Sequence, residues 1–229
     1  MFVIRLLPRL ALIALCVLLV RAPQPNGLTE ALQHGAAAAQ RGDFGIAFNA
    51  YQAALAYLPN DTYVLRQLYA LSMAARRYDM AAAYLTRLTA LKGYSGTLHR
   101  LWAEHHSTQG NAQAADAHRL AALSDDPNDL PLLRALAESA LARRDWQTAS
   151  DHLSRAAALA PNDPDLRYQR ALLSLADQPQ AAAAWLADLP DNSRFRAAQT
   201  LRLLIDTYAD EPPTAFAFRC GLALIEARQ

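Results

Sequence analysis

Residues 128–161 read NDLPLLRALAESALARRDWQTASDHLSRAAALAP, with two apolar segments on either side of a polar centre. Ala and Leu supply most of both segments, and Arg143, Arg144 and Asp145 separate them. Ala and Leu have high helix propensity, and the proline that closes the stretch cannot continue a helix. The stretch therefore predicts two helices joined by a short turn.

The same pattern recurs along the chain with a 34-residue period. Residues that end a helix fall at Pro59, Gly93, Pro127 and Pro161. Two columns of small or apolar residues keep this spacing: Ala47, Ala81, Ala115 and Ala149, then Ala54, Leu88, Ala122 and Ala156. A third column is large and apolar except for its arginine: Tyr51, Leu85, Arg119 and Leu153. Since each helix pair leaves one face uncovered, neighbouring pairs must stack, and we expect four units over residues 28–163.

This spacing resembles the tetratricopeptide repeat family. The first and fourth units match the family signature of small, small, aromatic, small and proline residues. The matching residues are Gly35, Ala47, Tyr51, Ala54 and Pro59 in the first unit, and Ala137, Trp146, Ala149, Ala156 and Pro161 in the fourth. The second unit departs at Tyr69 and Gly93, and the third at Arg119. The resemblance implies an all-α fold, a right-handed α-solenoid of antiparallel helix hairpins that binds other proteins.

Composition supports a helical protein and excludes several classes of function. The 229 residues include 50 Ala, 39 Leu and only 8 Gly, which favours helices over a β-sandwich or barrel. The net charge of +1 lacks the strong positive excess that is typical of nucleic-acid-binding proteins. Two cysteines are too few for a disulfide framework or a cysteine zinc cluster. Lys92 is the one lysine among 22 basic residues, a bias associated with GC-rich bacterial genomes.

The first 22 residues, MFVIRLLPRLALIALCVLLVRA, predict export. Arg5 and Arg9 precede the apolar run at 10–20, as in a signal peptide. Pro23 disfavours cleavage after Ala22, so a transmembrane anchor with residues 2–20 in the membrane is the alternative. Either form predicts a periplasmic or extracytoplasmic domain that follows a linker at residues 23–27.

After residue 163 the spacing shifts. Residues 164–190 predict a shortened fifth hairpin, and residues 191–229 predict C-terminal helices, the last with Thr214 as its N-cap. The last helix carries several large apolar residues, which is unusual for a polar end cap. These residues are Phe216, Phe218, Leu222 and Ile225. We expect the helix either to fold back on its predecessor or to dock on a partner or on a second copy.

The sequence contains no catalytic motif. It has no glycine-rich phosphate loop, no HExxH, no GxSxG and no paired cysteines. His99 and His106 share a helical face, but two nitrogen donors without a third ligand make a poor metal site. Cys220 has no flanking base and is expected to be a buried, inert thiol. We therefore expect no enzyme activity, no catalytic residues, no cofactor and no metal.

The resemblance also implies a binding surface, because the first helices of such units line a concave groove. Arg66, Arg100 and Arg134 form one 34-residue column there, and Tyr63 and Tyr168 extend it. Guanidinium and aromatic groups suit an acidic or C-terminal peptide segment. The alternative is neutralisation by helix-face salt bridges, because an acidic residue follows each of the last two arginines by four positions. These residues are Glu104 and Glu138.

The chaperone-binding members of the family use Lys and Asn in the first unit, where this chain has Leu32 and Ala36. The resemblance therefore does not extend to an acidic chaperone tail. It implies a scaffold that binds a protein or peptide on the exported side of a bacterial membrane. The alternative is a structural subunit of an envelope complex, docked through the repeats and the last helix.

Overall fold

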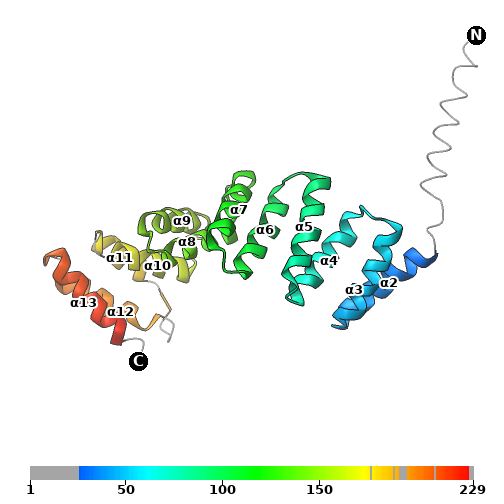
Figure 1. The fold of residues 1–229 in the computed structure, drawn as a ribbon. Coiled ribbons are helices and arrows are strands. Elements are labelled where there is room, and N and C mark those ends of the chain that lie inside the picture. Colours follow the sequence, from blue (N-terminus) through cyan, green and yellow to red (C-terminus); the bar gives the residue numbers. More distant parts are fainter. Residues whose placement is uncertain (1–25, 176, 188, 191–194, 209, 227–229) are drawn as a thin grey trace, which may run out of the picture. The chain divides into compact units, whose positions relative to one another are not determined.

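The computed structural model describes residues 26–175, 177–187, 189–190, 195–208 and 210–226. Within these ranges it contains helices α2 to α13 and no strand (Figure 1). The fold is all-helical, an α-solenoid of helix hairpins, as the repeat predicts. None of the described helices has the length and apolar character needed to cross a membrane. The predicted signal peptide or anchor lies outside the described residues.

The chain divides into two compact units. The first ends at Tyr94 and contains two hairpins. They are α2 (Asn26–Gln40) with α3 (Phe44–Tyr57), and α4 (Thr62–Ala74) with α5 (Tyr78–Lys92). In the first hairpin a Cβ at Gly35 would lie 3.2 Å from three ring carbons of Tyr51, so glycine allows the buried ring to pack against α2.

The second unit begins at Ser95 and contains three hairpins followed by two helices. The hairpins are α6 (Gly96–Thr108) with α7 (Ala112–Asp125), α8 (Leu130–Ala142) with α9 (Trp146–Leu159), and α10 (Pro164–Ser174) with α11 (Pro179–Leu186). Helix α12 (Ala197–Tyr208) packs on α11, and α13 (Pro213–Glu226) packs on α12.

The turn inside each of the first four hairpins repeats in detail. A residue with positive φ stands at Gly42, Arg76, Gly110 and Arg144, which keeps the period of the sequence pattern. The next amide donates to a carbonyl five residues before it, as in Asp145 N to Ala140 O at 2.9 Å. This left-handed helix end favours glycine, and two of the four positions carry arginine instead.

The starts of the first helices repeat as well. Asp61, Ser95, Asp129 and Asp163 are the N-caps of α4, α6, α8 and α10. Each side chain accepts a hydrogen bond from the amide three residues on, for example Leu132 N to Asp129 Oδ1 at 2.9 Å. A capped start satisfies amides that have no partner within the helix, so the same helix boundary recurs in α4, α6, α8 and α10.

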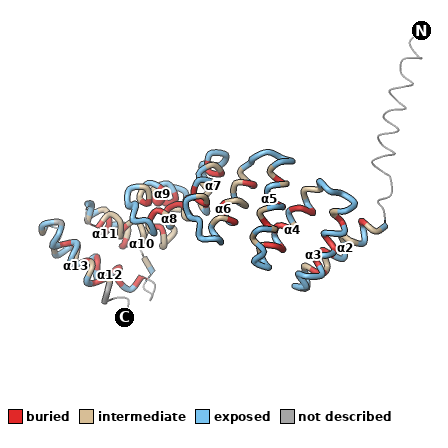
Figure 2. Tube along the Cα trace, viewed as in Figure 1, coloured by how far each residue is buried: buried red, intermediate tan, exposed pale blue. Residues whose placement is uncertain are grey.

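The small columns form the core of the hairpins. Ala47, Ala81, Ala115 and Ala149 are all 0% exposed. Buried residues recur on every hairpin, where its two helices face each other (Figure 2). The columns that the sequence predicts are therefore the positions at which helices cross.

A separate apolar core joins α10 to α13. Phe216, Cys220 and Ala223 lie on one face of α13 and are buried against α12 residues such as Leu201 and Ile205. The last helix thus folds back on its predecessor. Helix α13 begins at Pro213, so the prediction of an N-cap at Thr214 is wrong, because a proline fits the first turn and the helix begins two residues earlier than predicted.

Candidate functional site

The column of first-helix residues begins in the first unit, on α4. The side chain of Tyr63 is 52% exposed, and its hydroxyl lies 3.4 Å from the hydroxyl of Tyr51. Burial and this hydrogen bond raise the pKa of Tyr51. Arg66, one turn later, is exposed, and no hydrogen bond or ion pair to it is found among the described residues. Its charge is therefore available at the surface of α4.

The two arginines of the second unit are bound differently. Arg100 on α6 forms an ion pair with Asp129, and Asp126 lies 3.8 Å away. Arg134 on α8 forms the equivalent ion pair with Asp163. In both pairs the aspartate is the N-cap of the next hairpin's first helix, 29 positions further along the chain. We call these two pairs the arginine staples. They join consecutive hairpins and balance the charge of both arginines.

The glutamates four residues after the arginines are not their partners. Glu104 and Glu138 are exposed, and neither forms an ion pair among the described residues. A helical pair with the arginine before the acid is the weaker order, whereas the capping aspartates are already fixed by backbone amides. Because the staples balance the arginines, Glu104 and Glu138 are the unbalanced charges of this column on α6 and α8.

The staple motif also accounts for Arg66. The equivalent position in the next hairpin is Ser95, an uncharged cap, so the sequence provides no aspartate for a third staple. Tyr168 continues the column by sequence, but its ring packs edge-on to Phe195 at 5.4 Å and belongs to the C-terminal core. The column therefore has an arginine without a staple on α4, stapled arginines on α6 and α8, and an apolar contact on α10.

A buried carboxylate explains why the third 34-residue repeat has Arg119 in an otherwise apolar column. Asp116 is 7% exposed and accepts hydrogen bonds from Arg119 at 2.8 Å, Ser139 at 2.6 Å and Arg143 at 2.5 Å. Burial alone would raise the pKa of Asp116, but these donors outweigh it and hold the pKa below the usual value. Sequence reasoning missed this network, although a charge in an otherwise apolar column was its signal.

Four histidines and a tryptophan gather between α6 and α7. The Nδ1 atoms of His99 and His118 are 2.9 Å apart, and the ring of Trp102 stacks on His118 and His106. His105, which is 3% exposed, contacts both Trp102 and His106. Burial lowers the pKa of His118, and charge on His99 and His106 lowers it further.

The face shared by His99 and His106 is thus directed at α7, where sequence reasoning missed His118 as their common neighbour. Among the described residues no three His, Cys, Asp or Glu side chains are placed to hold a metal ion. In this cluster four imidazole rings and one indole pack against one another.

The last helix exposes part of its apolar surface. Phe216 is 2% exposed because the core of its own chain covers it, so this residue is not available for the alternative of docking on a partner or second copy. Phe218 and Leu222 are 69% and 46% exposed on another face, and the side chain of Ile225 is not among those described. Cys220 is buried, as predicted, and burial raises the pKa of its thiol.

Comparisons with known proteins place the fold. No family model matches the sequence, and no curated protein matches it. Among solved structures, MamA from Desulfovibrio magneticus RS-1 is similar over 77% of this chain and 97% of its own, with a TM-score of 0.60 and 12% identity. PilF of Pseudomonas aeruginosa is similar over 87% of this chain and 91% of its own, with a TM-score of 0.59 and 16% identity.

YrrB, described as a TPR protein with an unusual peptide-binding site, is similar over 78% of this chain and 91% of its own, with a TM-score of 0.56 and 11% identity. At these identities the likeness concerns the fold alone. The structure therefore has the helical-repeat fold of tetratricopeptide repeat proteins, in agreement with the 34-residue pattern of the sequence.

Proposed function

We propose that this chain is a non-enzymatic scaffold that binds a segment of another protein on the exposed faces of its first helices. One observation carries the proposal: in the second unit, carboxylates recur at one position on successive first helices and stay exposed after the staples have formed. They are Glu104 on α6 and Glu138 on α8, and in the first unit the exposed charge on α4 is Arg66, at the position of the stapled arginines. The fold supports the proposal, since YrrB, a protein of similar fold, is described as having a peptide-binding site.

The charges define the kind of segment. In the second unit the exposed carboxylates favour a segment with positive side chains, because Arg100 and Arg134 are balanced by their caps. In the first unit Arg66 and the exposed ring of Tyr63 favour a carboxylate or an aromatic residue. The acidic segment that the arginine column predicts is thus proposed for α4 alone.

A pull-down from native membranes with the full chain tests this proposal. The variant Glu104→Arg/Glu138→Arg reverses the free charges and leaves the staples intact. Asp151→Arg/Asp206→Arg makes the same change of charge at exposed carboxylates on α9 and α12, and serves as the matched control. We expect a partner captured by wild type and control to be lost with the first variant. Equal capture by all three proteins would overturn the proposal.

Arg66→Glu tests the first unit separately. This variant is preferable to a triple reversal of Arg66, Arg100 and Arg134, which would also place a carboxylate beside the caps at Asp129 and Asp163 and so destabilise helix starts. Loss of the partner with Arg66→Glu in a folded protein assigns α4 to the binding surface. Unchanged capture removes α4 from it.

A structural subunit of an envelope complex is the second candidate, favoured by the exposed Phe218 and Leu222 and by Leu203 on α12, which is 67% exposed. Phe218→Asp/Leu222→Asp should then release the chain from a complex isolated in detergent. Release by this variant, with no effect of Glu104→Arg/Glu138→Arg, would favour the second candidate over the first.

We also propose that the repeats act on the exported side of a bacterial membrane, on the basis of residues 1–22. A reporter enzyme that is active only after export, fused after residue 229, tests this location. Activity of the fusion, and its loss when Arg5 and Arg9 are kept but the run at 10–20 is deleted, is the expected result. Equal activity of both fusions would contradict it.

A further inference from the structure

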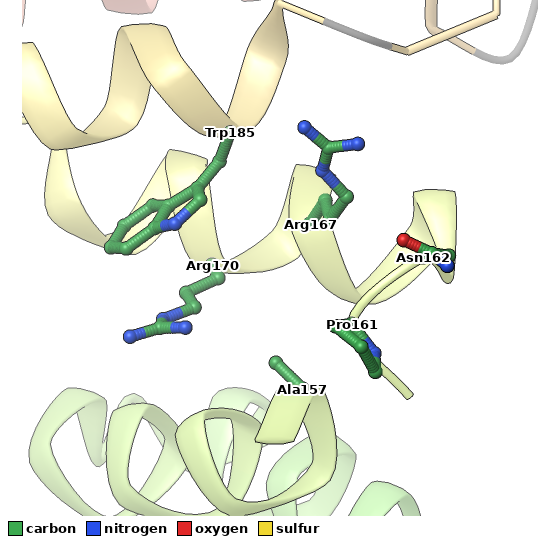
Figure 3. Close-up of a pocket in the computed structure, with 6 residues that line it drawn as sticks. All are labelled: Ala157, Pro161, Asn162, Arg167, Arg170 and Trp185. Carbon is green, nitrogen blue, oxygen red and sulfur yellow. The ribbon is translucent and has the colours of Figure 1, made fainter. Parts of the chain in front are cut away.

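A cavity of about 310 Å³ lies between α9, α10 and α11 in the second unit (Figure 3). Its described lining comes from three helices and the turn before α10: Ala157, Pro161, Asn162, Arg167, Arg170 and Trp185. Two guanidinium groups, one amide and one indole face a space that none of these residues supplies with a carboxylate. The lining therefore carries a net positive charge.

Arg170 stands where other hairpins have a core residue. On the 34-residue spacing it corresponds to Leu68 and Leu136, which are 0% and 3% exposed, and to Trp102. Those side chains fill the space between the two helices of their hairpins. A guanidinium cannot fill such a space without a partner, because burying an unpaired charge is costly. The exchange of leucine for arginine thus accompanies an open cavity at this position.

The indole of Trp185 stacks on one flat face of the Arg170 guanidinium. The guanidinium carbon of Arg170 lies 4.2 Å from the centre of the indole ring, a cation–π contact, and Figure 3 shows the indole extending from α11 toward this side chain. Stacking occupies the flat face of a guanidinium and leaves its N–H donors in the plane. Among the described residues no hydrogen bond or ion pair uses those donors.

Arg167 also lines the cavity, but its guanidinium is bound elsewhere. Its Nη2 donates to the carbonyl of Ala184 at 3.4 Å, and Figure 3 shows its guanidinium directed away from that of Arg170. Arg167 therefore adds positive charge at the rim. Asn162, on the turn before α10, adds an amide on the far side of Arg167 from the indole.

We propose that this cavity binds a carboxylate group of a polypeptide partner, with Arg170 as the anchor. A guanidinium can donate two parallel hydrogen bonds to a carboxylate, and stacking on an aromatic ring holds the guanidinium in a fixed orientation. The volume is at the lower end of small-ligand sites and suits one terminal residue or one acidic side chain. The inference rests on the proposed function in one respect, since a polypeptide partner supplies the carboxylate.

The test uses the full chain in detergent, labelled with 5-fluorotryptophan and observed by fluorine NMR. The three tryptophan signals are assigned with Trp→Phe variants, and Trp102 and Trp146 are internal references. The probes are acetyl-Ala-Ala-Ala with a free carboxylate, the same peptide as its amide, and acetyl-Ala-Glu-Ala-amide, all at constant ionic strength. We expect the Trp185 signal to shift saturably with at least one carboxylate probe and not with the simple amide.

Arg170→Met keeps an unbranched apolar chain beside Trp185 and removes the donors. It should weaken binding at least about tenfold, the effect of losing one charge-assisted hydrogen bond. Arg155→Met is the matched control, because that guanidinium donates to Pro127 O at 3.0 Å and does not line the cavity. Circular dichroism checks that both variants fold, and the comparison of acid with amide on wild type needs no variant.

The two carboxylate probes separate a chain terminus from an acidic side chain. A shift with the simple amide equal to that with both carboxylate probes, unchanged affinity in Arg170→Met, or no saturable shift at all would overturn the inference. So would inorganic phosphate that displaces the carboxylate probes at lower concentration. The pull-down with Glu104→Arg/Glu138→Arg does not involve Arg170, so the proposed function stands or fails separately.

Discussion

The hairpins α6–α7 and α8–α9 have the same backbone arrangement, but different kinds of side chain lie between their two helices. In α8–α9 the positions between the helices hold Leu133, Leu136 and Leu153, all buried, and the buried His152 stands at the position of His118. In α6–α7 the corresponding space holds the buried His105 and the rings of His118 and Trp102. Both hairpins keep the same fully buried alanine column and the same turn geometry.

The contrast shows what the repeat requires and what it leaves open. The spacing requires small residues where helices cross and a cap where a helix begins. It does not require that the remaining interior be apolar, and a buried polar group costs least where it has hydrogen-bond partners. Asp116 is an example, since three donors surround it. The two hairpins should therefore respond differently to mutation.

The largest effect is expected from Leu153→Ala in the apolar hairpin. Leu153 is 0% exposed, so the change removes buried apolar surface and leaves a cavity, at a cost of about 2–5 kcal/mol in the free energy of unfolding. Urea unfolding followed by circular dichroism measures the loss. A loss below about 1 kcal/mol would show that α8–α9 is not packed as described.

Asp116→Ala should come next, at about 1–3 kcal/mol. It removes the acceptor that Arg119, Ser139 and Arg143 share, and leaves their donors without this partner. The same urea experiment applies, with Asp151→Ala, an exposed carboxylate on α9, as control. An equal loss in both variants would mean that the network contributes nothing specific.

Mild acid should destabilise the chain through the histidines. Burial lowers the pKa of His118 and of His152 in the folded state, so the unfolded chain binds more protons as the pH falls through the ordinary histidine range. Stability is then lost from about pH 7 downward. The carboxyl pKa of Asp116 is shifted down as well, so its contribution persists until below about pH 4.

The measurement for this prediction is the melting temperature at pH 7.5 and 5.5. The decrease should be smaller in His118→Gln than in wild type, and unchanged in Leu153→Ala, which removes no titratable group. An equal decrease in wild type and His118→Gln would assign the acid sensitivity to other groups.

The smallest expected effect is an increase in the free energy of unfolding. Arg144 has φ of 60°, whereas the equivalent position in the α6–α7 turn is Gly110 with φ of 75°. Arg144→Gly removes the steric strain of a side chain in the left-handed region, and should stabilise by up to about 1 kcal/mol. The reverse change, Gly110→Arg, should destabilise by a similar amount. Thermal melts of both variants decide whether the turns are interchangeable.

Most of the fold could be predicted from the sequence because its determinants are local and periodic. The columns of small or apolar residues, the helix-ending proline or glycine and the turns recur in each of the four 34-residue repeats, and each has a direct conformational meaning. The C-terminal helices were harder to predict, because the period ends after residue 163 and no second copy of the pattern checks the boundaries. The misplaced N-cap at Thr214 is one result.

The candidate site was only partly predictable because its contacts join residues on different hairpins. The column of Arg66, Arg100 and Arg134 was visible, but the choice between Glu138 and Asp163 as partner of Arg134 depends on how two hairpins stack. Arg119 was visible as an exception, without its partner Asp116. Arg170 at a leucine position was a signal of the same kind, and only the structure shows the cavity beside it.

The arginine staples have a consequence for how this protein tolerates rearrangement. Arg100 and Arg134 are each satisfied by the hairpin that follows, so a new terminus or an inserted domain immediately before Asp129 or Asp163 would separate an ion pair and weaken a helix start. Ser95 begins the second unit without such an ion pair to Arg66, since serine carries no charge. We expect circular permutation and domain insertion to be tolerated best between Tyr94 and Ser95.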